Sequence, residues 1–365
     1  MILGVPKETV PGELRVALIP ESAARLVKAG VTVQVEPGAG LSAGFTDAAY
    51  TAAGAQLIDR SALLGGSDLI CKVQKPSPDE ATKLRRGAHL VSLLAPATSA
   101  ESIKALDAAG VTAFALELVP RITRAQSMDV LSSQATVAGY KAVLIGASAL
   151  TKFLPMLTTA AGTIAPSKCC ILGAGVAGLQ AIATARRLGA VVSGFDIRAA
   201  AAEQIRSLGA TVVAQDLIAA DSETAGGYAK EQSKEQQEAI QQALRDHLKG
   251  MDLVITTAQI PGRAAPRLIS TETVRTMAPG AVIVDLAAES GGNCEATKAG
   301  ETVDVNGVRV IGPVNLPASM PTHASQMLSR NILTFVQHLL TKEGALNVDP
   351  NDEITGAMIV TGRAA

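Results

Sequence analysis

One glycine-rich segment constrains the fold of this chain more than any other feature. It reads Gly173-Ala174-Gly175-Val176-Ala177-Gly178 and lies between an apolar run, 169–172, and a helical pattern, 176–188. A second apolar run follows and ends in Asp196, about 20 residues after the glycines, as a dinucleotide-binding fingerprint requires. Strand, glycine turn, helix and strand-terminal acid in this order predict a βαβ unit that binds a dinucleotide.

The three glycines have separate physical tasks in such a turn. Gly173 permits the tight turn, Gly175 has no side chain to keep a pyrophosphate away, and Gly178 lets the helix lie close to the strand. The helix begins at Val176, and its free N–H groups and positive dipole end favour phosphate binding. A glycine-rich turn without a ligand is the alternative, and the complete strand–turn–helix–strand context argues against it.

The residues after the second strand predict which dinucleotide is bound. Asp196 can accept hydrogen bonds from both ribose hydroxyls and repels a 2′-phosphate, which favours NAD(H) over NADP(H). Arg198 weakens this argument, because a nearby arginine can accept a 2′-phosphate. Gln259 follows a later strand of the same series, at the sheet edge where ligands bind. We therefore predict an NAD(H) site that includes Asp196, Ile197, Arg198 and Gln259.

Two series of alternating apolar runs and helical patterns divide the chain. Such alternation predicts parallel sheets that helices cover on both faces. The predicted strands are Ile2–Val5, Val31–Val35, Asp68–Val73, His89–Leu94 and Val111–Leu116 in the first series, and Lys168–Leu172, Val191–Phe195, Thr211–Val213, Asp252–Thr256 and Ala281–Asp285 in the second. Asn306-Gly307, between two apolar runs, predicts a tight hairpin near the end of the second series.

The predicted fold class is α/β, with two Rossmann-like domains that have mainly parallel sheets, are separated by a cleft and are bridged by long helices. The two bridging helices are expected at about 132–150 and 326–340. The first domain is expected to comprise residues 1–131 and about 316–365, because the C-terminus is expected to return to it. The NAD(H)-binding domain is expected to comprise residues 132–315.

Composition and charge exclude several other classes of protein. The net charge is −1 and the chain has no tryptophan, so the basic face and stacking aromatics of a nucleic-acid binder are missing. The most apolar stretch, 142–166, contains Lys152 and Pro155 and falls short of the roughly 20 apolar residues of a membrane helix. The four cysteines have no metal-binding spacing, so we expect no metal and buried, reduced thiols.

Three segments resemble a known family. They are Arg121 to Gln134, the glycine segment 173–178, and Glu223 to Lys230. In them the chain resembles the NAD(H)-binding alpha subunit of the proton-translocating NAD(P) transhydrogenases, within the alanine dehydrogenase/transhydrogenase family. The similarity covers nearly the whole chain and weakens only after about residue 340. The opening segment, 4–17, is shared with alanine dehydrogenases and does not separate the two groups.

The resemblance assigns a role to the first of these segments. In the transhydrogenase family the matching segment forms a loop beside the nicotinamide, and its functional residues correspond here to Arg121, Gln126, Asp129 and Ser132. An amide and a carboxylate can hold the carboxamide and the ribose, while a guanidinium can contact the pyrophosphate or stabilise the loop. From spacing alone, a polar connection between domains that ends in a helix N-terminus is the competing interpretation.

The third segment resembles the mobile loop with which this family covers bound nucleotide. Gly227 belongs to its Gly-Gly hinge, and Tyr228 has the apolar ring and hydrogen-bonding tip that suit a lid residue. Without the resemblance, a solvated linker before the helical pattern 234–248 is the better interpretation.

Alanine dehydrogenase is the main alternative function. Oxidation of an amino acid requires a group that takes the substrate's proton and cations that hold its carboxylate. By resemblance, the alanine dehydrogenases use a lysine, a histidine and an aspartate, and the matching positions here are Gln74, Ala95 and Glu289. Arg15 remains, but glutamine and alanine cannot move a proton near neutral pH. Hydride transfer between two nicotinamides needs no such group, and the sequence therefore favours a transhydrogenase.

Two further alternatives are a substitute acid–base group in an amino-acid dehydrogenase and a protein that binds NAD without catalysis. Lys72, Lys75 or His89 could replace the missing groups, although Lys75 faces away from Gln74 on an alternating strand, and His89 lies at the far end of its strand. A non-catalytic NAD-sensing module would keep the glycine fingerprint but would not need the loop residues assigned above.

The resemblance also implies an assembly. NADH on this chain is expected to give its hydride directly to NADP+ on a separate NADP(H)-binding component, coupled in the full complex to proton translocation by membrane-spanning subunits. The subunit is expected to be a homodimer, cytoplasmic and peripheral to the inner membrane, without direct membrane insertion and without activity in the absence of its partners. No nucleic-acid partner is expected.

Overall fold

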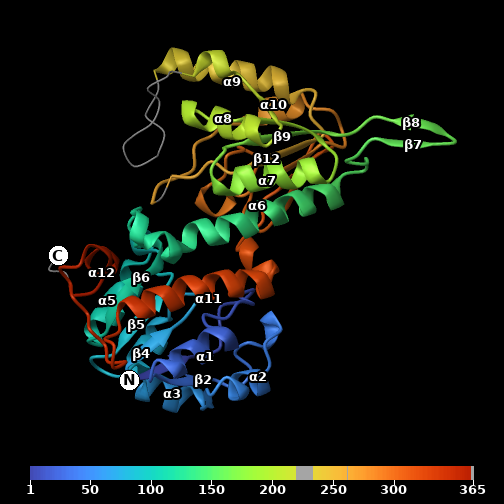
Figure 1. Cartoon of the computed structure of the whole chain (residues 1–365). Helices are drawn as coiled ribbons and strands as arrows, with labels where there is room; N and C mark the ends of the chain where they lie inside the picture. Colours follow the sequence, from blue (N-terminus) through green and yellow to red (C-terminus); the bar gives the residue numbers. More distant parts are fainter. Residues whose placement is uncertain (219–232, 261, 363–365) are drawn as a thin grey trace. The chain divides into compact units, whose positions relative to one another are not determined.

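The computed structural model describes residues 1–218, 233–260 and 262–362. Figure 1 shows the chain and its elements, which form two compact units. The first unit contains residues 1–134 and 317–365, and the second contains residues 135–316. Each is built on an open sheet with helices on both faces, which confirms the predicted α/β fold with two Rossmann-like units.

The first unit contains a six-stranded parallel sheet with the order β3-β2-β1-β4-β5-β6. Its neighbouring residues alternate between two cores: Leu69 and Cys71 lie in one, and Ile70 lies in the other. The strands are β1 (Ile2–Val5), β2 (Thr32–Val35), β3 (Gln56–Leu57), β4 (Leu69–Cys71), β5 (His89–Ser92) and β6 (Thr112–Ala115).

Helices from both ends of the chain cover this sheet. One core is shared by α1, α11 and α12, and the opposite core by α3, α4 and α5. The helices of the unit are α1 (Pro20–Lys28), α2 (Asp47–Ala52), α3 (Arg60–Gly66), α4 (Pro78–Lys83), α5 (Ala100–Ala108), α11 (Pro321–His338) and α12 (Glu353–Met358).

Of the two helices expected to bridge the units, only α6 (Val130–Ala149) crosses the boundary. Helix α11 lies wholly in the first unit, because Leu328, Ile332 and Phe335 are part of that unit's core. The chain returns to the first unit at residues 316–317, just before α11 begins.

The second unit contains a seven-stranded sheet with the order β11-β10-β9-β12-β13-β15-β14. Within this sheet only β14 runs antiparallel to its neighbour, through a turn at Asn306 (φ 54°) and Gly307 (φ 81°), which confirms the predicted hairpin. The strands are β9 (Lys168–Leu172), β10 (Val191–Phe195), β11 (Thr211–Val212), β12 (Leu253–Thr256), β13 (Val282–Asp285), β14 (Thr302–Val305) and β15 (Val308–Ile311).

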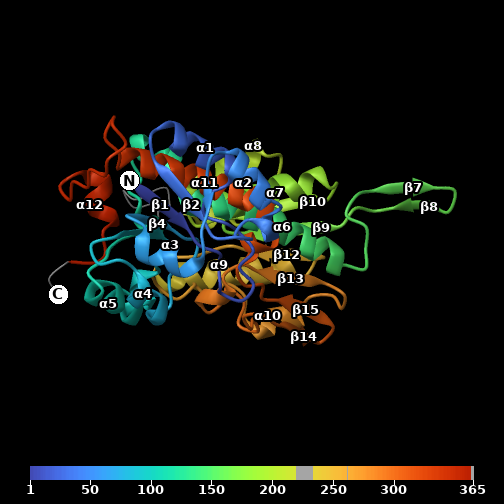
Figure 2. The same cartoon turned by 90° about the horizontal axis from the view of Figure 1, so that it is seen from below.

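Two further features complete this unit. Helices α6, α7 and α8 share one core, and α9 and α10 share the other; the new elements are α7 (Val176–Arg187), α8 (Ala199–Ser207), α9 (Lys234–Leu248) and α10 (Thr271–Arg275). A separate hairpin, β7 (Leu157–Thr159) and β8 (Gly162–Ile164), extends from the unit as an arm (Figures 1 and 2). The sequence pattern did not predict this arm, because its short strands have no polar–apolar alternation.

Candidate functional site

The glycine turn lies where the strand order of the second sheet reverses. It follows β9, which pairs with β10 on one side and with β12 on the other, and ligands of open α/β sheets bind at such a reversal. Gly173 has a φ of 96°, and a Cβ there would lie 2.7 Å from Thr257 Oγ1. A Cβ at Gly178 would lie 1.8 Å from Gly173 O. The fold itself therefore requires glycine at both positions.

Gly175 is different, because no packing contact with the described residues requires it. It has a φ of −75°, and apart from its chain neighbours no atom of the described residues lies within 4 Å of the position of a Cβ. It is the N-cap of α7, and no side chain in the described part of the chain caps the free N–H groups of this helix end. Val176, the first residue of α7, is exposed beside it. This open helix end has the geometry that phosphate binding requires.

Asp196 is buried and holds the turn in place. Its Oδ2 accepts hydrogen bonds from Ala174 N at 2.7 Å and from an Arg198 guanidinium nitrogen at 2.8 Å. Its Oδ1 accepts from Arg198 N and Nε, both at 2.9 Å. A ribose hydroxyl that binds Asp196 therefore competes with Arg198, and Arg198 is engaged by Asp196 rather than available to a 2′-phosphate. Ile197 lies between these two residues in the sequence and is partly buried against the core of the second unit that α9 and α10 share.

Two buried polar residues that the sequence did not reveal fix the neighbouring loops. Asp285 ends β13 and accepts hydrogen bonds from Thr256 Oγ1, Ala287 N, Cys294 N and Thr297 Oγ1. Asn293 accepts from Ala258 N at 3.0 Å and donates to Ala258 O and Pro266 O, both at 2.8 Å. Their partners are far apart in the sequence, so only the strand-terminal position of Asp285 could have indicated this network.

Gln259 lies on the loop that Asn293 supports. Its Nε2 donates to Leu286 O at 2.9 Å, and the residue remains exposed. The same loop contacts the glycine turn, since Thr257 Oγ1 donates to Gly173 O at 3.0 Å. The predicted lid residues Gly227 and Tyr228 lie outside the described residues.

The other predicted loop contains a short 3-10 helix, η4 (Thr123–Met128), followed directly by α6. Asp129 caps α6: its two carboxylate oxygens accept from Ser132 N at 2.8 Å and from Ser132 Oγ at 2.6 Å. Arg121 is exposed and has an interaction partner. Gln126 is exposed, and its side chain makes no hydrogen bond to any described residue. In the structure Asp129 and Ser132 form the N-terminus of α6, as the competing interpretation expects, and the role of this loop beside the nicotinamide stays a prediction.

Helix α6 continues from this cap into the second unit, where two glycines let it pack closely. A Cβ at Gly139 would lie 2.1 Å from Ala177 O, at the start of α7. A Cβ at Gly146 would lie 2.5 Å from Leu253 Cδ1 on β12. The part of α6 that belongs to the second unit is therefore packed directly against the helix that follows the glycine turn.

The strand order of the first sheet also reverses, between β1 and β4, but this edge is occupied by the chain itself. Glu8 follows β1 and accepts hydrogen bonds from Val73 N at 2.6 Å and from Gln74 N at 3.4 Å. Burial raises the pKa of Glu8, although the ammonium of Lys72, 3.5 Å away, opposes this. A carboxylate of the protein thus takes the backbone N–H groups that an anionic ligand would use.

The residues expected to hold an amino acid are paired with one another. Arg15 is buried, and its Nε and a terminal nitrogen donate to the two oxygens of Glu13 at 2.8 and 2.7 Å. The other terminal nitrogen donates to Gln134 Oε1 at 2.8 Å, and Gln74 Nε2 donates to Glu13 Oε2 at 2.8 Å. Although burial opposes it, hydrogen bonding and the charge of Arg15 lower the pKa of Glu13. The pair is therefore ionised and satisfied without a ligand.

The candidate substitutes for the missing acid–base residues are also engaged or misplaced. Lys72 is buried between Glu8 and Glu80, and Lys75 Nζ donates to Ser99 Oγ. His89 begins β5, whereas Ala95 follows the end of that strand. Burial lowers the pKa of His89, which stacks on Phe114 at 6.1 Å in the interior. Glu289 accepts a hydrogen bond from Asn315 N at 3.1 Å.

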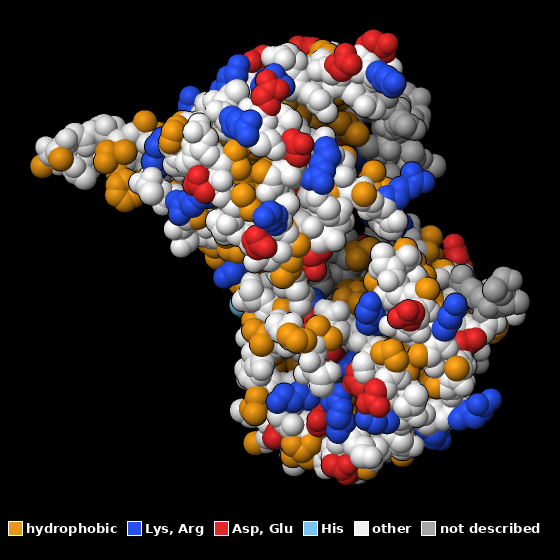
Figure 3. All heavy atoms as spheres, turned by 180° about the vertical axis from the view of Figure 1, so that it is seen from behind, with side chains coloured by type: hydrophobic (Ala, Val, Ile, Leu, Met, Phe, Trp, Pro, Cys, Tyr) orange, Lys and Arg blue, Asp and Glu red, His pale blue; other side chains and the backbone are white. Residues whose placement is uncertain are grey.

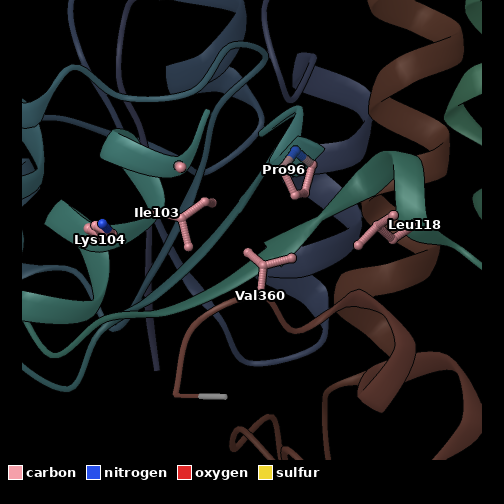
Figure 4. Close-up of a pocket in the computed structure, with 6 residues that line it drawn as sticks. Pro96, Ile103, Lys104, Leu118 and Val360 are labelled. Atoms are coloured by element: carbon pink, nitrogen blue, oxygen red, sulfur yellow. The ribbon is translucent and has the colours of Figure 1, made fainter. Parts of the chain in front are cut away.

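A hollow of about 380 Å³ on the first unit contains none of the predicted site residues (Figure 4). Its apolar walls come from η2 (Pro96–Thr98), α5, η3 (Leu116–Leu118) and Val360, with Lys104 as its one charged lining residue.

In the described part of the chain, no group of three or more His, Cys, Asp or Glu side chains could hold a metal ion, and no helix is long and apolar enough to cross a membrane.

The four cysteines are buried and free, as expected. Burial raises the pKa of each thiol, that of Cys294 to about 11. Since the thiolate is the reactive form, these cysteines are structural at neutral pH.

Comparison with known proteins places the chain in a class. The domain described as "Alanine dehydrogenase/PNT, N-terminal domain" matches residues 4–138, and "Alanine dehydrogenase/PNT, C-terminal domain" matches residues 142–364. The chain therefore belongs to the alanine dehydrogenase/PNT family, which confirms the predicted family.

Within the family, similarity is greater to transhydrogenase subunits. An NAD(P) transhydrogenase subunit alpha polypeptide of Rhodospirillum rubrum is 44% identical over 99% of this chain and 96% of its own length. The solved transhydrogenase structure from Sinorhizobium meliloti has a TM-score of 0.90 and 44% identity, over 99% of this chain and 98% of that chain. The alanine dehydrogenase of Bacillus subtilis is 32% identical over 94% and 86% of the respective chains. The predicted preference for the transhydrogenase branch is confirmed.

Proposed function

We propose that this chain is the NAD(H)-binding subunit of a proton-translocating NAD(P) transhydrogenase. In this proposal it binds NADH, and the hydride passes directly to NADP+ held by a partner component. The observation that carries the proposal is the contrast between the two sheet edges. The glycine turn of the second unit is open to a phosphate ligand at Gly175. In the first unit, Glu8 already accepts from the backbone N–H group of Val73, and Glu13 already accepts from the guanidinium of Arg15.

The same contrast argues against amino-acid oxidation. A substrate carboxylate would have to displace Glu13 from Arg15, a charge-assisted, two-point contact inside the protein. Neither Gln74 nor Ala95 can accept a proton, and Lys72 is held between two carboxylates. Direct hydride transfer requires only that two nicotinamide rings approach to about 3–3.5 Å with water excluded.

We assign the site residues accordingly. Gly173, Gly175, Val176 and Gly178 form the pyrophosphate site, and Asp196, Ile197 and Arg198 hold the adenosine ribose, with Gln259, Gly227 and Tyr228 as further contacts. Arg121, Gln126, Asp129 and Ser132 hold the nicotinamide end. We also propose that residues 1–131 with about 316–365 are one folding domain, and residues 132–315 the NAD(H)-binding domain.

Direct transfer can be tested with deuterium. The chain is mixed with NADH that carries deuterium at the transferred C4 position and with an NADP(H)-binding component that carries NADP+. The proposal predicts NADPH that contains the deuterium. NADPH formed with solvent hydrogen, or no NADPH at all, contradicts direct transfer.

The coenzyme preference should depend on Asp196. In Asp196→Asn, the ribose hydroxyls lose a charged acceptor and the Arg198 guanidinium loses the negative charge of its carboxylate partner, so NADH should bind about tenfold more weakly and NADPH more tightly than in the wild type. Titration calorimetry with each nucleotide measures both effects. In the double variant Asp196→Asn, Arg198→Ala, the gain in NADPH affinity should disappear. Unchanged NADH affinity in the single variant contradicts the role given to Asp196.

The arm formed by β7 and β8 supports a homodimer. Residues 153–166 include no charged residue, and Phe153, Met156 and Ile164 are 54%, 62% and 47% exposed. Figure 3 shows hydrophobic side chains along this projecting arm. An isolated two-stranded hairpin is marginally stable in water, and its uncharged open edges favour pairing with another strand. A second copy is the simplest partner, because twofold symmetry lets one surface serve both subunits.

This homodimer can be tested by sedimentation velocity. Phe153→Ser with Met156→Ser should shift the chain toward the monomer, with NADH affinity unchanged. The control is Leu41→Ser, which removes a residue that is 57% exposed on the first unit and should leave the dimer intact. A dimer that withstands both arm substitutions contradicts this interface.

We further propose that the dimer lies on the cytoplasmic face of the inner membrane, where membrane-spanning subunits of the complex dock to it.

A further inference from the structure

Helix α11 contacts the predicted nicotinamide loop through one buried amide. Asn331 is 8% exposed, and its Nδ2 donates to Ser127 O at 2.8 Å. Ser127 directly follows Gln126 in η4, so this hydrogen bond fixes the peptide between Ser127 and Met128, one residue after Gln126. Both partners lie in the first unit.

The amide of Asn331 is not optimal for stability. Its Oδ1 is buried and has no hydrogen-bond partner among the residues that the structure describes. A buried acceptor without a partner costs free energy, and an apolar side chain of similar size would avoid that cost. The hydrogen bond from Nδ2 to Ser127 O is therefore the contact that an apolar residue at this position would lose.

The remaining contacts of the loop leave the Gln126 side chain available. Ala125 and Met128 are buried in the same core as α11, and Asp129 N donates to Gln126 O at 3.2 Å. Asp129 in turn is held by Ser132. The loop is thus fixed on both sides of Gln126, whose exposed amide makes no hydrogen bond within the described structure.

We propose that Asn331 is a positioning residue for hydride transfer: by holding Ser127 O, it fixes the turn that presents Gln126 to the nicotinamide. This inference rests on the proposed function, because it assumes that Gln126 contacts the nicotinamide. Asn331 itself touches neither nucleotide nor reacting atoms. Its effect is on the geometry of the bound complex, so it changes the rate of transfer more than the affinity for NADH.

The test compares Asn331→Leu with Ser329→Ala, a matched substitution on the same helix. Ser329 is also buried and polar, but it accepts from Ile19 N at 3.0 Å and donates to Ser22 Oγ at 2.7 Å, away from the loop. Each variant is measured by hydrogen–deuterium exchange, by NADH titration, and by single-turnover transfer to NADP+ on the partner component. Leucine removes both ends of the buried amide, so Asn331→Leu should remain folded.

Asn331→Leu should accelerate exchange in the peptide 121–130 and slow hydride transfer about tenfold, with the Kd for NADH within about threefold of wild type. Ser329→Ala should accelerate exchange only around 15–22 and leave transfer within about twofold. Equal losses of transfer in the two variants, or unchanged exchange in 121–130 of Asn331→Leu, overturn the inference. If the wild-type chain transfers no hydride, the proposed function fails, while the exchange measurement still decides whether Asn331 orders the loop.

Discussion

Gly175→Ala should weaken NADH binding at least about a hundredfold, or ~2.8 kcal/mol, while the chain folds with unchanged stability. Apart from the chain neighbours of Gly175, no atom of the described residues lies within 4 Å of the new Cβ, and the backbone at this residue has an ordinary φ of −75°. A methyl group there is therefore expected to meet the ligand, at the point where a pyrophosphate must approach the N-terminus of α7. Titration calorimetry measures the affinity, and thermal unfolding measures the stability.

Gly178→Ala is the matched control in the same turn. Its Cβ would lie 1.8 Å from Gly173 O, so the variant should lose stability by about 3 kcal/mol or more through overpacking. Binding loss without stability loss is therefore expected only at Gly175. If Gly175→Ala binds NADH like the wild type, the nucleotide does not use this turn.

Gln126→Asn should slow hydride transfer about a hundredfold, with NADH affinity within about twofold of wild type. The substitution keeps the amide but shortens the side chain by one methylene, and a displacement of about 1 Å can cost a hundredfold in rate when geometry controls the reaction. The exposed Gln126 amide makes no hydrogen bond to the described residues, so the change should leave the fold intact. Single-turnover transfer and NADH titration separate the two quantities.

Ser127→Ala is the control for this loop, because the structure uses the backbone carbonyl of Ser127. It should transfer hydride at nearly the wild-type rate. If Gln126→Asn instead weakens NADH binding strongly and leaves a normal rate of transfer per bound complex, Gln126 is a binding residue and its assigned role is wrong.

The parts of the fold that the sequence predicted correctly are those with local signals. The strand, glycine turn and helix around 173–178 are contiguous, and each step has its own residue requirement. The Asn306-Gly307 hairpin is equally local, because both residues adopt the positive φ that such a turn needs. By contrast, β3 has two residues and the β7–β8 arm has no alternation, so neither produced a pattern.

The supporting contacts of the candidate site were not predictable, because they join distant parts of the chain. Asn331 and Ser127 are 204 residues apart, and Arg15 and Gln134 are 119 apart. Nothing in either local sequence indicates such a pair. The pairing of Arg198 with Asp196 is local, but the sequence alone does not distinguish an arginine that pairs with this carboxylate from one that accepts a 2′-phosphate.

NADH on this chain should give its hydride to NADP+ on a partner rather than to an imine formed from a keto acid and ammonia. The most direct test follows NADH oxidation by the purified chain in two mixtures, one with pyruvate and ammonia, and one with a separately expressed NADP(H)-binding component that carries NADP+. We predict turnover only in the second mixture. Turnover with pyruvate and ammonia would contradict the proposed function, because it would require a proton path that bypasses Gln74 and Ala95 and a substrate carboxylate that displaces Glu13 from Arg15.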